Sequence, residues 1–244
     1  MTWLAALFNR TSLLQLSLHS AIAAVLVAGW LLVAREVATD YALPVTFEIV
    51  ATWLTLVCVL MTAKQNMWCW PTGVVSVLMF GWLFYEVQLY SSAVMNVVYY
   101  FPIQFYGWYQ WMYGGEKKAE REPVWSSYQE RLFTIIGVGT VFSAWAWYLV
   151  TYTDAVSVAP DAAIFALSFV AQWIMSYKRL ESWLLWIAVD ILSPIVYWQN
   201  GLYMIATLYA GFLGIAVYGF FSWWREARQN SNLMYGDRRM IGRL

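Results

Sequence analysis

Side chains that could bind a small molecule recur on one face of the apolar stretch 183–200. At helical spacing, the residues on that face are Trp183, Trp186, Asp190, Ser193 or Pro194, and Tyr197. A carboxylate facing lipid is too costly to keep, so this face should point into protein or into a wet cavity. Two indoles, an acid and a phenol on one cavity wall suit a flat small molecule with polar edges.

Other polar side chains inside apolar stretches are candidates for the same site. Asn96, Tyr100 and Gln104 follow one another at four-residue spacing and form a polar, aromatic stripe. The remaining candidate substrate contacts are Gln88, Gln172, Tyr203 and Thr207. A competing interpretation is that the amides only bridge helices by hydrogen bonds, as Asn and Gln often do within membranes.

The composition indicates the environment in which these groups must be held. Hydrophobic residues make up 62% of the 244 residues and charged residues 11%, whereas charged residues are about a quarter of a soluble domain. The formal net charge of zero gives no reason to expect a nucleic-acid partner. We therefore expect a membrane protein whose partners are lipid and a small molecule.

Eight apolar runs are long enough to cross a bilayer as helices. They are 13–34, 44–63, 69–86, 91–113, 132–151, 160–177, 183–199 and 202–224. Runs of this length exclude barrel strands, which need only about 10 residues. The predicted fold is all-α with eight transmembrane helices.

The basic residues orient these helices. If the N-terminus is inside, the inner segments carry thirteen Lys and Arg residues and the outer loops carry only Arg35. This asymmetry predicts a multi-pass protein of the bacterial cytoplasmic (inner) membrane with both termini in the cytoplasm.

The chain also contains a weak internal repeat on either side of the polar connector 114–131. Trp70 corresponds to Trp183, and Gly107 to Gly219, at offsets of 113 and 112 residues. This offset predicts a 3+1+3 core of two parallel three-helix repeats, with a site between them near mid-bilayer and an extra N-terminal helix outside the core. The expected segments are 1–43 with the extra helix, 44–113 as first repeat, 114–159 as loop and linker helix, 160–225 as second repeat and 226–244 as cytoplasmic tail.

Several kinds of chemistry find no support. His19 is the single histidine, so we expect no nucleophile–base pair, no metal site, no cofactor and no enzyme activity.

Cys58 and Cys69 fit packing positions better than a disulfide. Trp223 and Trp224 end an apolar run and should be interfacial or packing residues rather than ligand contacts. No Lys or Arg lies inside a run, so the ligand should be uncharged or cationic.

Several segments resemble the PnuC family of bacterial nicotinamide riboside transporters. They are Trp70-Pro-Thr-Gly73 to Tyr90, Tyr106-Gly107-Trp108 and Glu181-Ser-Trp183-Leu-Leu-Trp186, and the likeness spans about 45–225. The plan of the core is similar to that of SWEET sugar transporters. The resemblance implies facilitated diffusion of nicotinamide riboside, a vitamin B3 form and NAD precursor, which a cytoplasmic kinase then traps by phosphorylation. The family often has an amide where this chain has Asp190.

The residues fit that ligand and leave alternatives open. Trp183 and Trp186 could stack on the pyridinium ring, the amides could pair with its carboxamide, and Asp190 could bind ribose hydroxyls or offset the charge. Thiamine and riboflavin are competing flat vitamins, and Asp190 could instead carry a proton in a coupled carrier. From other classes, a membrane enzyme or a sensory or structural bundle without substrate remains open. Self-association, for instance as a trimer, is compatible with apolar outer faces, although no motif specifies it.

Overall fold

The structure is a computed structural model, and it describes residues 42–86, 93–115, 120–153, 158–199 and 203–241. The predicted helix at 13–34 and the candidate Gln88 lie outside these residues. Within the described ranges the regular elements are all helices, joined by turns and loops that contain one isolated bridge between Val124 and Arg179. The all-α fold class is therefore confirmed.

The helices coincide with the predicted apolar runs from 44–63 onward. They are α3 (Ala42–Ala63), α4 (Cys69–Glu86), the π-helical segment η1 (Met95–Tyr100), α6 (Phe101–Tyr113), α7 (Tyr128–Tyr152), α8 (Val158–Met175), α9 (Glu181–Gln199) and α10 (Tyr203–Ile241). By length and composition, α7 and α8 are the described helices most clearly able to cross a bilayer. α10 continues beyond the predicted end at 224, because residues 225–235 include no Gly or Pro to stop it.

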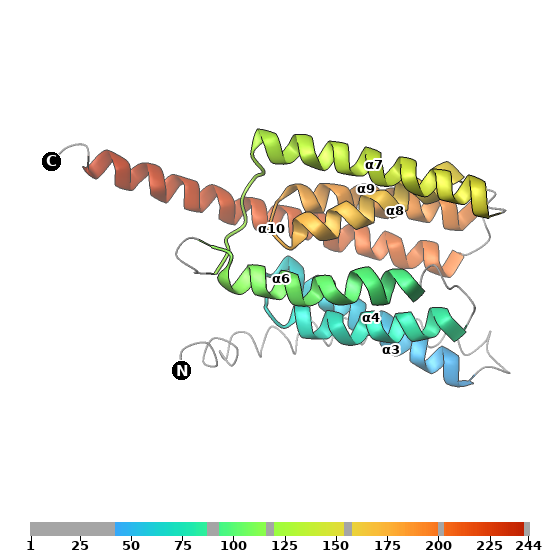
Figure 1. Cartoon of the computed structure of the whole chain (residues 1–244). Coiled ribbons are helices and arrows are strands. Elements are labelled where there is room, and N and C mark those ends of the chain that lie inside the picture. The colour runs from blue at the N-terminus through green and yellow to red at the C-terminus, as the bar shows by residue number, and fades with distance from the viewer. Residues whose placement is uncertain (1–41, 87–92, 116–119, 154–157, 200–202, 242–244) are drawn as a thin grey trace. The chain divides into compact units, whose positions relative to one another are not determined.

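The chain forms two compact units, Met1–Tyr109 and Gln110–Leu244. In the first unit α3 packs on α4, and α4 packs on η1. In the second unit α8, α9 and α10 pack in chain order, and α7 packs on α8 (Figure 1). The linker helix of the sequence prediction thus belongs to the second unit.

The turns that end α3 and α8 have the same hydrogen-bonded form. Gln65 and Lys178, 113 residues apart, both adopt left-handed backbone conformations, with φ of 56° and 49°. At the first turn, Asn66 N–H donates to Met61 O at 2.9 Å and Gln65 N–H to Thr62 O at 2.9 Å. At the second, the corresponding residues repeat both bonds, at 3.2 and 2.9 Å. Both turns are Schellman caps, so the backbone supports the internal repeat seen in the sequence.

The linker helix α7 begins at a capping box. Ser127 accepts from the N–H of Glu130, and the Glu130 carboxylate accepts from the N–H of Ser127 at 2.7 Å. Further along, the Trp145 ring stacks on Phe165 of α8, with ring centroids 4.0 Å apart. The Phe165 ring thus packs α8 against α7.

Ion pairs fasten the start of α7 to the turn between α8 and α9. The Glu181 carboxylate accepts from Arg131 at 2.9 Å, from the Ser126 hydroxyl at 2.9 Å and from the Ser126 N–H at 3.0 Å. Arg179 pairs with Glu130. The buried Lys178 ammonium lies 3.3 Å from Glu120. This network holds the charged end of the second unit together.

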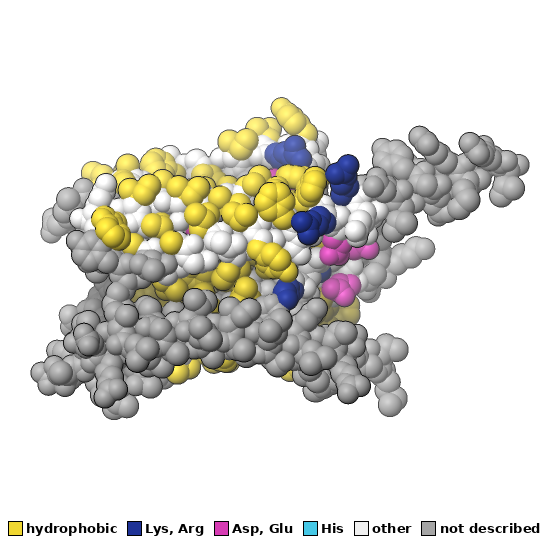
Figure 2. Space-filling view, turned by 180° about the vertical axis from the view of Figure 1, so that it is seen from behind, with side chains coloured by type: hydrophobic (Ala, Val, Ile, Leu, Met, Phe, Trp, Pro, Cys, Tyr) yellow, Lys and Arg dark blue, Asp and Glu magenta, His cyan; other side chains and the backbone are white. Residues whose placement is uncertain are grey.

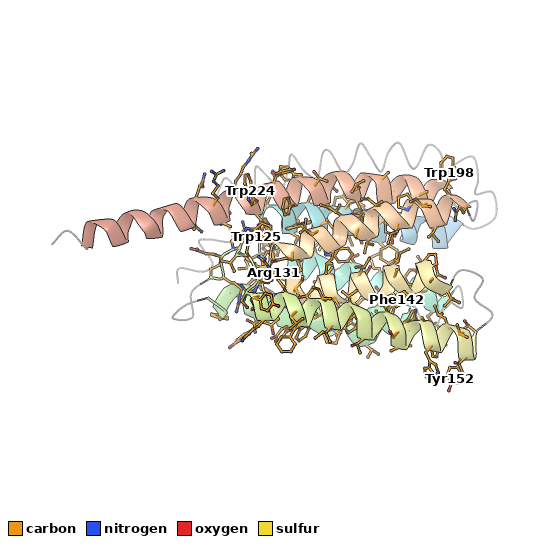
Figure 3. All side chains as sticks on the ribbon, turned by 90° about the horizontal axis from the view of Figure 1, so that it is seen from above. Trp125, Arg131, Phe142, Tyr152, Trp198 and Trp224 are labelled. Carbon is orange, nitrogen blue, oxygen red and sulfur yellow. The ribbon has the colours of Figure 1, made fainter. Side chains whose placement is uncertain are left out.

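Aromatic side chains mark the two ends of the second unit. Figure 3 places Trp125, Arg131 and Trp224 at one end and Tyr152 and Trp198 at the other. Hydrophobic side chains cover much of the flank between the ends, and Lys, Arg, Asp and Glu gather toward one end (Figure 2). Two aromatic girdles around an apolar band are the usual signature of the two membrane interfaces.

Candidate functional site

Asp190 occupies the middle of α9 and is almost fully enclosed. It is the tenth of nineteen helix residues, and 4% of its surface is exposed. No described residue forms a hydrogen bond or ion pair with its side chain. A carboxylate kept only for structure would be paired inside the protein, because an unpaired buried charge costs several kcal/mol (roughly). The geometry therefore favours a carboxylate that binds a ligand over one with a structural role.

Two further polar atoms on this face of α9 have no hydrogen-bond partner. They are the Ser193 hydroxyl and the Trp183 indole N–H, and both residues are fully buried. Ser193 lies three residues after Asp190, less than one helical turn away. The face predicted from the sequence is thus buried and holds three polar groups that neighbouring side chains do not satisfy.

The ring of Trp183 packs against its own unit. A Cβ placed on Gly219 of α10 would lie 2.6 Å from two of its ring carbons, and the Trp223 ring meets it edge-on at 5.5 Å. Trp111 packs on the other side of Trp223 at 5.6 Å. Trp223, expected to be an interfacial or a packing residue, is fully buried and packs against these two indoles.

Trp186 differs from Trp183 in its exposure. It is half-buried on the same helix face, and at the repeat offset of 113 residues its counterpart in the first unit is Gly73. Trp183, by contrast, corresponds to Trp70, which packs on Gly107 even more tightly than Trp183 packs on Gly219. Because the packing of Trp183 recurs at its counterpart Trp70, we interpret Trp183 as a packing residue. Trp186 is then the indole that remains available for stacking on a ligand.

In the first unit, Gln104 is likewise a buried polar side chain without a hydrogen bond to a described residue. It is 6% exposed, and its amide oxygen lies 2.6 Å from the position that a Cβ of Gly73 would take. Only a glycine at position 73 leaves room for the amide there. The motif Trp70-Pro-Thr-Gly73 thus supplies one residue that packs on Gly107 and one that makes space for Gln104.

Asn96 faces the same helix as Gln104. Its Cβ lies 3.6 Å from the Cβ position of Gly81, eight residues after Gly73 on α4. In a regular α-helix, two residues that are eight positions apart, such as Asn96 and Gln104, point in directions about 80° apart around the helix axis. The π-helical turn η1 takes about 4.4 residues per turn and removes most of that angle. Tyr100 lies between Asn96 and Gln104 in the sequence, and the centroid of its ring is 5.2 Å from that of Tyr99.

The remaining predicted contacts are less informative. Gln172 is half-buried on α8. The side chains of Tyr197, Tyr203 and Thr207 lie outside the described part of the structure, as does Gln88. On α10, an added Cβ at Gly211 or Gly214 would meet no described atom. The close approach is at Gly219.

The cysteines and acids also constrain the chemistry. Cys69 is buried as a free thiol, and the Cys58 thiol donates to the Cys69 carbonyl at 3.1 Å. Among the residues that the structure describes, no three His, Cys, Asp or Glu side chains come together as a metal site would require. What the geometry offers is binding: a buried acid, a hydroxyl, amides and an accessible indole.

Comparison with known proteins agrees with this picture. A family model described as nicotinamide mononucleotide transporter matches residues 45–225. The nicotinamide riboside transporter PnuC of Escherichia coli (strain K12) is 27% identical over 210 residues, covering 76% of this chain and 87% of the relative. The riboflavin/roseoflavin transporter RibM of Streptomyces davaonensis is 27% identical over 190 residues, covering 75% and 87%.

The fold has a counterpart among solved structures. The crystal structure of the vitamin B3 transporter PnuC superimposes with a TM-score of 0.64 at 23% sequence identity, covering 91% of this chain and 94% of that one. At this identity the likeness concerns the fold alone. Because the family model spans most of the chain, the protein belongs to the nicotinamide mononucleotide transporter family.

Proposed function

We propose that this protein carries nicotinamide riboside across the bacterial inner membrane. The observation that carries the proposal is the buried carboxyl group of Asp190, which has no partner among the described residues and shares its helix face with Trp186. The names of the relatives from Escherichia coli and Neisseria mucosa support the same ligand.

The chemistry of the riboside matches these groups. Its pyridinium ring is flat and cationic, so the Asp190 carboxylate offsets its charge and Trp186 stacks on its face. A charge-assisted contact of this kind contributes about 1.5–3 kcal/mol, and a cation–π contact about 0.5–2 kcal/mol.

The free riboside suits this site better than the mononucleotide in the family's description. A phosphate would bring a double negative charge into the membrane, where Asp190 repels it. Three basic side chains near the start of α9 are engaged with acids: Arg131, Lys178 and Arg179 pair with Glu residues at the end of the second unit. Glu181 begins α9, so that end lies about 14 Å along the helix from Asp190.

Riboflavin is the second candidate ligand. The relative from Streptomyces davaonensis is named a riboflavin/roseoflavin transporter and is also 27% identical to this chain. Riboflavin is flat and carries a hydroxylated chain, but its ring is uncharged. A ligand without charge would leave the negative charge of the buried Asp190 carboxylate uncompensated, and this favours the riboside.

The proposal extends to the mode of transport. The ligand moves down its gradient by alternating access through a 3+1+3 core, to which an N-terminal helix is added. Both termini lie in the cytoplasm, where a riboside kinase phosphorylates the ligand and so prevents its return. The protein functions as a transporter and carries out no reaction itself, and its apolar outer faces allow a homo-oligomer such as a trimer.

Uptake into liposomes tests the proposal. Purified protein is reconstituted, and entry of radiolabelled nicotinamide riboside, its 5′-phosphate and riboflavin is measured without an ion gradient. We expect saturable entry of the riboside alone, unchanged by a protonophore. Entry of riboflavin alone would transfer the assignment to the second candidate. Entry of the 5′-phosphate at an equal rate would contradict the charge argument.

A further inference from the structure

Pro194 lies inside α9, four residues after Asp190. In an α-helix the N–H of residue 194 would donate to the carbonyl of residue 190, and proline has no N–H. α9 nevertheless continues from Glu181 to Gln199. The backbone carbonyl of Asp190 therefore lacks its regular helical hydrogen bond, next to a carboxyl group that has no described partner either.

The hydroxyl of Ser193 is equally unengaged. Six other Ser and Thr hydroxyls in the described helices and their ends donate to the carbonyl four residues earlier. They are Thr55, Thr62, Thr72, Thr134, Ser143 and Thr153. Ser193 makes no such bond, although it is completely buried. A buried hydroxyl without a partner costs about 1–3 kcal/mol, so its retention points to a ligand that satisfies it.

Three polar groups thus come together within one turn of α9: the Asp190 carboxylate, the Asp190 carbonyl and the Ser193 hydroxyl. Two of them only accept hydrogen bonds, and the third both donates and accepts. Offsetting a cation requires the carboxylate alone. Two neighbouring hydroxyl groups of a sugar match the whole set, because each O–H donates to one acceptor while the oxygen of one of them accepts from the serine.

We propose that this turn of α9 binds the 2′,3′-diol of the ribose, and that Pro194 determines sugar specificity by keeping the Asp190 carbonyl available. The inference rests on the proposed function for the identity of the ligand. Nicotinamide riboside and riboflavin, named in the relatives' descriptions, differ in their rings and share a hydroxylated five-carbon chain. A site for hydroxyl groups suits both.

Two ligands that differ only in the sugar test the proposal. Nicotinamide riboside and 1-methylnicotinamide have the same cationic ring and carboxamide, but the second has a methyl group in place of ribose. Calorimetry should show that Pro194→Ala and Ser193→Ala each raise the Kd of the riboside about tenfold. The Kd of 1-methylnicotinamide should stay within about twofold, because the ring contacts are unchanged. Pro71→Ala is the matched control, since Pro71 lies in the first turn of α4 where no N–H is needed.

Equal weakening of both ligands by Pro194→Ala would overturn the proposal, since it would indicate a general distortion of α9. Unchanged riboside affinity in both α9 variants would overturn it as well. A second measurement needs no ligand: infrared spectra of protein carrying ¹³C at the aspartate carbonyls. Pro194→Ala should move the Asp190 band to lower frequency, because the new N–H donates to it.

An unmoved band would show that the carbonyl was already engaged and would overturn the proposed role of Pro194. If the unaltered protein binds neither cation, the proposed function fails and the ribose assignment fails with it. The infrared shift would in that case still decide whether Pro194 frees the carbonyl. The two failures are therefore distinguishable.

Discussion

Replacing Gly219 by Ala should destabilise the second unit, although alanine normally stabilises a helix. The added Cβ would lie 2.6 Å from two carbons of the Trp183 ring and 2.8 Å from a third, where about 3.5–4.0 Å is needed. The ring cannot withdraw easily, because Trp183 is buried and meets Trp223 edge-on. Overpacking of this kind costs about 1–3 kcal/mol, and the change from Gly to Ala returns up to about 1 kcal/mol.

Gly211→Ala is the matched control on the same helix. It gains the same helix propensity, and its new Cβ meets no described atom. The difference between the two variants therefore isolates the overpacking term, and we expect Gly219→Ala to be less stable than Gly211→Ala by about 1–3 kcal/mol. Thermal unfolding in detergent, followed by circular dichroism, measures it. Equal melting temperatures of the two variants would refute the contact with Trp183. If the difference between them persists when Trp183→Phe is added to both, the clash with the Trp183 ring is not its cause.

Three further outcomes follow from the described contacts. Gln65→Gly should stabilise the protein by about 1 kcal/mol, because glycine adopts the left-handed conformation at φ 56° without steric cost; a lower melting temperature would contradict this. Glu181→Ala should destabilise it by about 1–3 kcal/mol, measured by the same melts, because the buried Ser126 N–H and hydroxyl lose their acceptor. Gly73→Ala should weaken nicotinamide riboside binding in calorimetry about tenfold, since the Cβ displaces the Gln104 amide; unchanged affinity would argue against a role for Gln104.

The helices were predictable because the membrane limits the choices. Only long apolar helices or closed barrels satisfy the backbone in lipid, so runs such as 69–86 could be placed from hydrophobicity alone, and α4 has those bounds. The repeat was predictable because its offset is nearly constant: Trp70 and Trp183 are 113 residues apart and pack on glycines that are 112 apart. The exclusion of an unpaired acid from lipid predicted the burial of Asp190.

What the sequence could not provide were contacts between distant residues. Trp223 ends an apolar run, and that position left an interfacial and a packing role open; the partners that decide for packing, Trp111 and Trp183, are far away in the chain. Phe165 shared a helix face with Gln172, yet the stacking partner that turns it away is Trp145 on another helix. The π-helical turn before Pro102 also has no local signal, since Pro194 lies inside a helix that stays α throughout.

The most direct test of the central claim, that the Asp190 carboxylate receives a cation, compares two forms of one ligand. Nicotinamide riboside is cationic, and its 1,4-dihydro form has nearly the same shape without the charge. Binding of both is measured by calorimetry in the unaltered protein and in Asp190→Asn, which keeps the volume and removes the charge. We predict that the unaltered protein prefers the cation and that Asp190→Asn weakens binding of the cation about ten- to hundredfold more than binding of the neutral form. An equal effect on both forms, or none on either, would contradict the account.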